Sequence, residues 1–310
     1  MLRWKILLLV SVWLVPNEWL LSTPALVMAT ILVLALGIPH GATDHVVFNV
    51  LRQKEVRTRV PGVFLLGYLG VMLLYFLLWW WQPAGSLLVF LVISAYHFGE
   101  TQLIRTPQVG VAMHGLYLSW GGLMLAVLLL LHLEEVTQLL LPLVGHPAVF
   151  VWLGQHTVTL LALAAGQILL LWAWQAFRTG RVKYLTAQVA ELCVLLLLLW
   201  RTPVLIGFAI FFAFWHSRDA ITEQLDRFRV LRPQIRWWEW VRMALPYTMM
   251  SVVGIVGLVA VWWVYRVSIS PVTVFFVGVS LLTMPHMILI YRFYQLPTSQ
   301  FEGEALVSPR

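Results

Sequence analysis

Long apolar stretches separated by short polar ones follow one another along the whole chain. Charged residues and prolines mark off ten such stretches, most of them near the roughly 20 residues that a helix needs to cross a bilayer. The pattern predicts an all-α, polytopic integral membrane helical bundle of about ten helices, with a range of eight to ten. The predicted helices cover residues 4–21, 24–51, 61–82, 84–104, 110–132, 153–177, 184–200, 203–228, 241–266 and 271–294.

The polar stretches between these helices are too short to fold alone, so we predict one transmembrane domain over residues 1–310. Composition agrees, because 61% of the residues are hydrophobic and 11% are charged, whereas soluble proteins average about 25% charged residues. The formal net charge of +7 comes from basic residues in short loops. It therefore indicates membrane topology and not nucleic-acid binding.

Basic residues occur in every second predicted loop, which indicates the orientation of the helices. Cytoplasmic loops of membrane proteins carry an excess of lysine and arginine. The alternation predicts a multi-pass protein of the inner (cytoplasmic) membrane with both termini in the cytoplasm. The basic segments are Arg3 with Lys5, Arg52–Arg59, Arg105, Arg178–Lys183 and Arg227–Arg236.

Four histidines lie deep inside predicted helices and at similar depths. They are 13 to 16 residues from the predicted outer helix ends, which corresponds to about 20–24 Å at the α-helical rise. Ionisable groups at such depth are costly and usually face the bundle interior. One such histidine could simply bind a neighbouring helix, but four at one depth predict a metal site in the bundle core, since imidazole is a common ligand of iron, zinc and copper. The four are His40, His97, His216 and His286.

Three acidic residues follow these histidines at helical spacing. Asp44 is four positions after His40, Glu100 is three after His97, and Asp219 is three after His216. Such spacings share a helix face, and a carboxylate commonly orients a metal-binding imidazole. The alternative is that these carboxylates are charges at helix ends.

Four local motifs resemble the Brp/Blh family, the bacteriorhodopsin-related proteins. They are Gly37-Ile-Pro-His-Gly-Ala-Thr-Asp-His45, Ser94-Ala-Tyr-His-Phe-Gly-Glu100, Phe214-Trp-His-Ser217 and Met284-Pro-His-Met287. The resemblance implies a membrane β-carotene 15,15′-dioxygenase that cleaves the central double bond with O2 to give retinal. It also implies a non-haem Fe2+ held by histidines.

The resemblance assigns catalytic and metal-binding roles to His40, His97 and His216, which match three family ligands. A fourth family histidine is replaced here by Ala220. His286 could complete the set, Asp219 could do so, or three protein ligands could suffice. A decayed site, or one with a changed substrate, is the remaining alternative.

The expected partners are β-carotene, O2 and the lipid bilayer, with a retinal-binding rhodopsin as a candidate protein partner and no nucleic acid. Residues expected to line a polyene slot flank the histidine motifs, although ordinary packing explains each equally well. They are Tyr96, Phe98, Phe214 and Trp215.

Other functions fit the same residues. Histidines and carboxylates inside a membrane can form a proton relay in a transporter. A non-catalytic carotenoid- or rhodopsin-associated membrane protein and a histidine-ligated haem protein are further alternatives.

Overall fold

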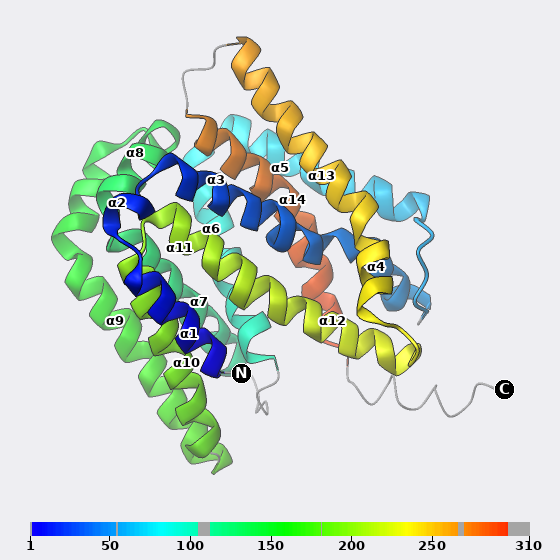
Figure 1. Cartoon of the computed structure of the whole chain (residues 1–310), viewed down its shortest axis with the longest axis horizontal. Coiled ribbons are helices and arrows are strands. Elements are labelled where there is room, and N and C mark those ends of the chain that lie inside the picture. Colours follow the sequence, from blue (N-terminus) through cyan, green and yellow to red (C-terminus); the bar gives the residue numbers. More distant parts are fainter. Residues whose placement is uncertain (1, 54, 105–111, 181, 266–269, 297–310) are drawn as a thin grey trace. The chain divides into compact units, whose positions relative to one another are not determined.

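The computed structural model describes residues 2–53, 55–104, 112–180, 182–265 and 270–296, and these segments are helical almost throughout, without a strand (Figure 1). Several residues used in the topology prediction lie outside the described residues. They are Lys54, Arg105, Arg181, the side chain of Lys183 and the loop 266–269.

Among the described residues, eight helices are long and apolar enough to cross a membrane. This confirms the prediction of an all-α, multi-pass membrane bundle. The eight are Thr23–Arg52, Gly62–Trp81, Pro83–Leu103, Met113–Leu130, Pro147–Thr179, Val204–Leu231, Trp237–Tyr265 and Pro271–Tyr294.

The two other predicted helices differ in outcome. The predicted helix 4–21 is broken at Pro16 into two short helices, because proline cannot continue the helical hydrogen bonding. The predicted helix 184–200 corresponds to a helix that is not among the eight. These elements are α1 (Leu2–Leu14), α2 (Asn17–Leu20) and α10 (Val182–Arg201).

Contacts divide the chain into two compact units, and the first comprises Met1–Val33 and Leu91–Trp215. Within it, α7 packs against α9 and α10, α1 packs along α10, and α11 packs against α3. The prediction of one transmembrane domain stays a prediction. Besides α1, α2 and α10, the unit contains α3 (Thr23–Leu32), most of α6 (Pro83–Leu103), α7 (Ala112–Leu130), α8 (Leu133–Val144), α9 (Pro147–Thr179), α11 (Val204–Ile210) and most of η3 (Phe211–Ser217).

The packing of α1 on α10 includes a buried ion pair. Lys5 Nζ lies 3.2 Å from Glu191 Oε1, and the lysine side chain is fully buried. In the sequence, Lys5 lies at the start of the predicted helix 4–21, among the basic residues that mark the cytoplasmic side. In the structure α1 begins at Leu2, and the Lys5 side chain is buried within the unit.

The second unit comprises Leu34–Phe90 and His216–Arg310. Within it, α13 packs against η2 and α14, and α14 packs against α4 and α5. Its elements are most of η1 (Val33–Gly37), η2 (Ile38–Thr43), α4 (Asp44–Gln53), α5 (Gly62–Trp81), the start of α6, α12 (Arg218–Leu231), α13 (Trp237–Tyr265) and α14 (Pro271–Tyr294).

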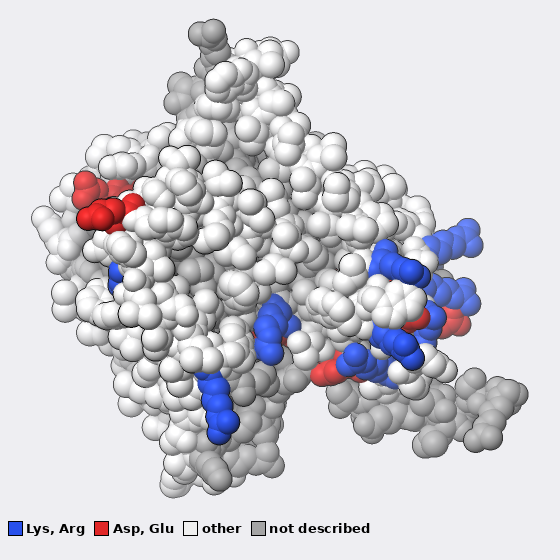
Figure 2. All heavy atoms as spheres, viewed as in Figure 1, with Lys and Arg blue, Asp and Glu red and all other residues white. Residues whose placement is uncertain are grey.

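The helices differ in how much of their surface the protein buries. In α5 and in α9, only 11% of the most apolar stretch is buried inside the protein. In the span Val204–Leu231, 72% of the corresponding stretch is buried. Weakly buried apolar helices can face lipid, whereas the strongly buried span must pack against protein. Figure 2 shows a largely uncharged face, and within the second unit the charged side chains gather over the ends of α4 and α12 and the start of α13.

Gly99 and Gly121 permit α6 and α7 to pack backbone to backbone in the first unit. A Cβ at Gly121 would lie 1.8 Å from the Ala95 carbonyl oxygen, and one at Gly99 would lie 1.9 Å from the Tyr117 carbonyl oxygen. Real Cβ atoms never approach a carbonyl so closely, so only glycine fits at either position.

We predict that Gly121→Ala destabilises the protein, because α6 and α7 would have to separate. Crowding of a well-packed contact costs about 1–3 kcal/mol. The measurement is the Tm of the detergent-purified protein. Gly122→Ala is the control, because a Cβ there meets no described atom within 4 Å. Equal melting of the two variants would contradict the close packing.

Candidate metal centre

Non-α backbone surrounds His40 and His216 on two of the long spans. The span that begins at Thr23 passes through the π-helix η1 and then the 3-10 helix η2, which contains His40. His216 lies in the π-helix η3. Pro39 lacks an amide hydrogen, so regular α-helical hydrogen bonding cannot run through it. Such π-segments occur frequently at functional sites.

Three buried histidines of the second unit face one another. The Nε2 atoms of His40 and His216 are 3.3 Å apart. The ring centroid of His40 is 4.8 Å from that of His216 and 4.8 Å from that of His286, with both pairs edge to face. Residues far apart in the sequence therefore form one cluster of imidazoles.

The Nδ1 atoms of two of these rings are occupied by oxygen partners. His40 Nδ1–H donates to the Gly37 carbonyl oxygen, and the Ser217 hydroxyl lies 3.1 Å from the same nitrogen. His286 Nδ1 is 2.8 Å from Asp44 Oδ1. When Nδ1 carries the proton, the lone pair is on Nε2, which is the usual arrangement of a histidine that binds a metal.

Asp44 therefore contacts a different histidine from the one that the sequence indicated. We expected it to orient His40, four positions earlier, but it lies beside His286 on α14. The helical rule failed because residues 38–43 form a 3-10 helix, in which three residues complete a turn. A fourth position is then rotated away from the first. The hydroxyl of Tyr68 on α5 donates to Asp44 Oδ2 at 3.1 Å, so both carboxylate oxygens have partners.

Gln224 holds the backbone beside His40 in place. Its amide nitrogen donates to the His40 carbonyl oxygen at 3.0 Å, and its amide oxygen accepts from the Thr43 hydroxyl at 2.9 Å. Trp240 Nε1 donates to the same oxygen at 3.3 Å. Gln224 is fully buried. Gln224 was not among the residues predicted from the sequence, although a glutamine inside a membrane-spanning helix is itself an unusual polar group.

His97 lies on α6 in the first unit. His97 is buried, and its ring offers a nitrogen that a metal ion could bind. Glu100 is buried on the same helix. Asp219 on α12 lies 3.4 Å from Arg218 and is only partly buried. The roles of Glu100 and Asp219 in orienting rings stay predictions.

The aromatic residues expected to line a polyene slot all lie in the first unit. Tyr96 Oη is 2.6 Å from His114 Nδ1, and the Phe98 ring packs edge-on against Phe211. Phe214 lines a cavity of about 320 Å³ formed with α1 and α3. Trp215 is fully buried, and its ring packs against Trp4. Their substrate contacts stay predictions.

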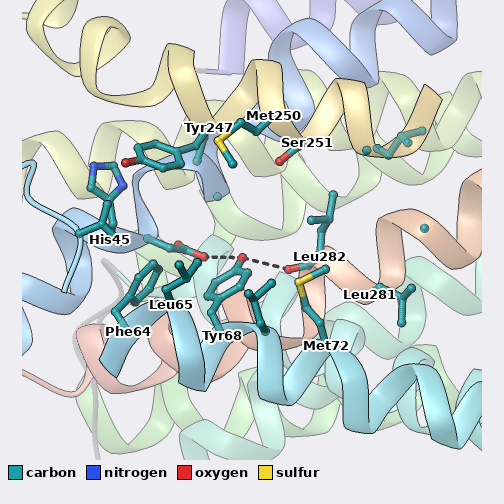
Figure 3. A pocket seen from close by; sticks show the side chains of 18 of the residues that line it. His45, Phe64, Leu65, Tyr68, Met72, Tyr247, Met250, Ser251, Leu281 and Leu282 are labelled. Atoms are coloured by element: carbon teal, nitrogen blue, oxygen red, sulfur yellow. Dashed lines mark hydrogen bonds between the residues drawn. The ribbon is translucent and has the colours of Figure 1, made fainter. Parts of the chain in front are cut away.

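A cavity of about 340 Å³ in the second unit was not expected from the sequence (Figure 3). Its walls come from α5, α13 and α14, and its lining includes Asp44, His45 and Tyr68. The ring of His45 lies 4.3 Å from that of Tyr247, and both residues line the cavity. Only tertiary structure brings these helices together.

The histidine cluster fits a metal ion on two observations. Its possible ligands are imidazole nitrogens in a buried setting, which suit iron, zinc and copper. The 3.3 Å between His40 Nε2 and His216 Nε2 also matches two nitrogens at about 2.0–2.1 Å from one ion with a near-tetrahedral angle. The residues present are therefore chemically suited to such a group.

The chain is similar to known proteins over most of its length. A family model described as β-carotene 15,15′-dioxygenase matches residues 31–294. A curated β-carotene 15,15′-dioxygenase from uncultured marine bacterium 66A03 is 29% identical over 272 residues, which are 84% of this chain and 91% of that relative. No solved structure matches the chain.

We predict that Gln224→Leu lowers the stability of the protein, because the His40 carbonyl, the Thr43 hydroxyl and the Trp240 indole would lose buried partners. Each unsatisfied buried group costs about 1–3 kcal/mol. Thermal unfolding in detergent measures the effect. Gln234→Leu is the control, since Gln234 is exposed in the turn before α13. Equal Tm values for the two variants would contradict the role given to Gln224.

Proposed function

The chain belongs to the β-carotene 15,15′-dioxygenase family, and we propose that it cleaves the central double bond of β-carotene with O2 to give two molecules of retinal. One oxygen atom of O2 ends on each carbon of the broken bond. The observation that carries the proposal is the buried cluster of His40, His216 and His286, which lies inside the matched region 31–294.

We propose that four histidines hold a non-haem Fe2+ in this protein. His40, His216 and His286 form the cluster described above, and His97 is buried on a helix whose sequence places it at the same depth. When bound, ferrous iron supplies activation of O2 towards a carbon–carbon double bond. In this proposal, His286 takes the place of the family histidine that is replaced by Ala220 in this chain.

The residues around the cluster have distinct tasks in this proposal. The Gly37 carbonyl keeps a proton on Nδ1 of His40, and Asp44 keeps one on Nδ1 of His286. The Nε2 lone pair of each ring is then available to bind the metal. Tyr68 restrains Asp44. Gln224 holds the His40 backbone against α12. The apolar surroundings exclude water and admit a polyene dissolved in the bilayer.

We also propose that the protein lies in the inner membrane with both termini in the cytoplasm. The support is the alternation of basic and non-basic loops. The charged side chains at the ends of α4 and α12 and the start of α13 gather in one region of the second unit (Figure 2). A rhodopsin that accepts the retinal stays a prediction.

Expression in β-carotene-producing cells should bleach the carotenoid and yield retinal. Extraction and chromatography of retinoids measure the outcome. Cells that carry the His40→Ala variant are the control and should keep their β-carotene. Production of shorter or longer apocarotenals instead of retinal would contradict central cleavage, and unchanged β-carotene with wild-type protein would contradict the enzyme assignment.

We predict that His286→Ala abolishes iron retention, because a ligand is lost, whereas Asp44→Asn weakens iron binding by about 10–100-fold, the usual scale for a lost partner of a ligand. Elemental analysis of anaerobically purified protein measures iron content independently of turnover. Stoichiometric binding of a metal other than iron that also supports cleavage would contradict the choice of iron.

The control for this series is Asp226→Asn, the same change at an exposed carboxylate that pairs with Arg229. It should keep full iron content. Full iron binding in His286→Ala would remove His286 from the ligand set and leave three protein ligands or Asp219 as the alternatives.

A further inference from the structure

The cavity in the second unit is almost entirely apolar along its length. Methionine, leucine and phenylalanine side chains form its walls, with Phe64, Met72 and Met250 among them. Figure 3 shows α13 on one side, α5 on the other, His45 at one end, and Leu281 towards the opposite end. Flexible methionines adapt to irregular ligands. The lining therefore suits an elongated hydrocarbon.

The polar end of this cavity adjoins the histidine cluster. Gly41 and Asp44 line the cavity, and Asp44 Oδ1 is 2.8 Å from His286 Nδ1. A Cβ at Gly41 would lie 3.3 Å from the same nitrogen, so glycine at this position lets the cavity wall lie directly against the His286 ring. A ligand in the cavity can therefore extend to Gly41 and Asp44, the two residues that lie against Nδ1 of His286.

The opposite end follows α14 away from His286. Gly278, Leu281 and Leu282 line the cavity from that helix, and Gly278 is eight residues before His286, about 12 Å at the α-helical rise. The cavity thus runs along the helix that carries a histidine of the cluster.

We propose that this cavity binds one ring-bearing isoprenoid arm of the carotenoid, with the central double bond at the Gly41 end and the ring at the Gly278 end. This inference rests on the proposed function. β-Carotene is symmetric about the bond to be cleaved, so each half needs its own space on one side of the reacting carbons. A volume of about 340 Å³ is near the lower end of ligand pockets, roughly 300–1,000 Å³, and suits one half of the molecule.

The length of the arm that fits between the two ends then determines which double bond reaches the histidines. An arm whose ring lies at the Gly278 end would place the central double bond of a symmetric carotenoid at the Gly41 end. Met72, Leu258 and Gly278 line the cavity wall and take no part in the contacts described for the histidines. Substitutions there would change which carotenoids bind and would leave the reaction itself unchanged.

Gly254→Leu tests this proposal, because Gly254 lines the cavity and a Cβ there meets no described atom within 4 Å. The leucine should occupy cavity space without displacing protein atoms. We expect weaker binding and a higher KM for β-carotene by about 10-fold or more, the scale for crowding a hydrophobic pocket. Anaerobic titration with β-carotene, followed by carotenoid absorbance, measures binding without turnover.

Gly257→Leu is the matched control. It lies on the same helix, also meets open space, and is absent from the cavity lining. It should bind and cleave β-carotene as wild type does. A second pair, Met72→Trp in the cavity and Leu73→Trp on the exposed face of α5, repeats the test if Gly254→Leu fails to fold.

A shortened substrate separates crowding from general damage. β-Apo-8′-carotenal keeps one ring-bearing arm and has a shorter second arm without a ring, which can enter the narrowed cavity. Gly254→Leu should therefore lose less activity with this substrate than with β-carotene. Equal losses on both substrates, or unchanged β-carotene binding, would overturn the cavity assignment. Wild-type protein that makes no retinal would overturn the proposed function instead.

Discussion

A buried ring nitrogen needs a hydrogen-bond or metal partner, because neither lipid nor an apolar core can solvate it. This requirement explains much of the local structure around the histidines. The Gly37 carbonyl, which accepts from His40, lies where α-helical geometry is interrupted by a π-segment and Pro39. The interruption makes this carbonyl available to a side chain, and Ser217 donates to it as well. Irregular backbone here satisfies polar groups that a regular helix would leave unpaired.

The same interruptions create hydrogen bonds between distant segments. Residues 40–43 are held by Gln224 from α12, and Gln224 is held in turn by Trp240 from α13. Asp44 links the following helix to His286 on α14 and to Tyr68 on α5. Buried polar networks of this kind favour one arrangement of the helices only when every member is paired. The position of each imidazole is therefore determined by contacts from several helices.

The sequence predicted the features that depend on local periodicity. Apolar length predicted the membrane helices, and the depth of the histidines picked out His40, His216 and His286, which the structure brings together. It did not predict which carboxylate meets which histidine, because the 3-10 turn rotates Asp44 away from the face that α-helical spacing assigns. Gln224 and the cavity were missed for a related reason. Both depend on contacts between helices that are distant in the sequence.

Polar and apolar requirements meet at Gly41. This residue follows His40 in the irregular turn, lines the cavity, and lies against the His286 ring. A side chain here would press against the His286 imidazole, because its Cβ would lie 3.3 Å from Nδ1. Gly37, Ser217 and Asp44 are hydrogen-bond partners of the imidazoles, and Gln224 holds the backbone beside His40. The residues that would hold a hydrocarbon lie mainly along α5, α13 and α14. Asp44 and Tyr68 belong both to the cavity lining and to the hydrogen bonds of His286, whereas cavity positions such as Met72 and Gly254 form none of the hydrogen bonds described for the histidines.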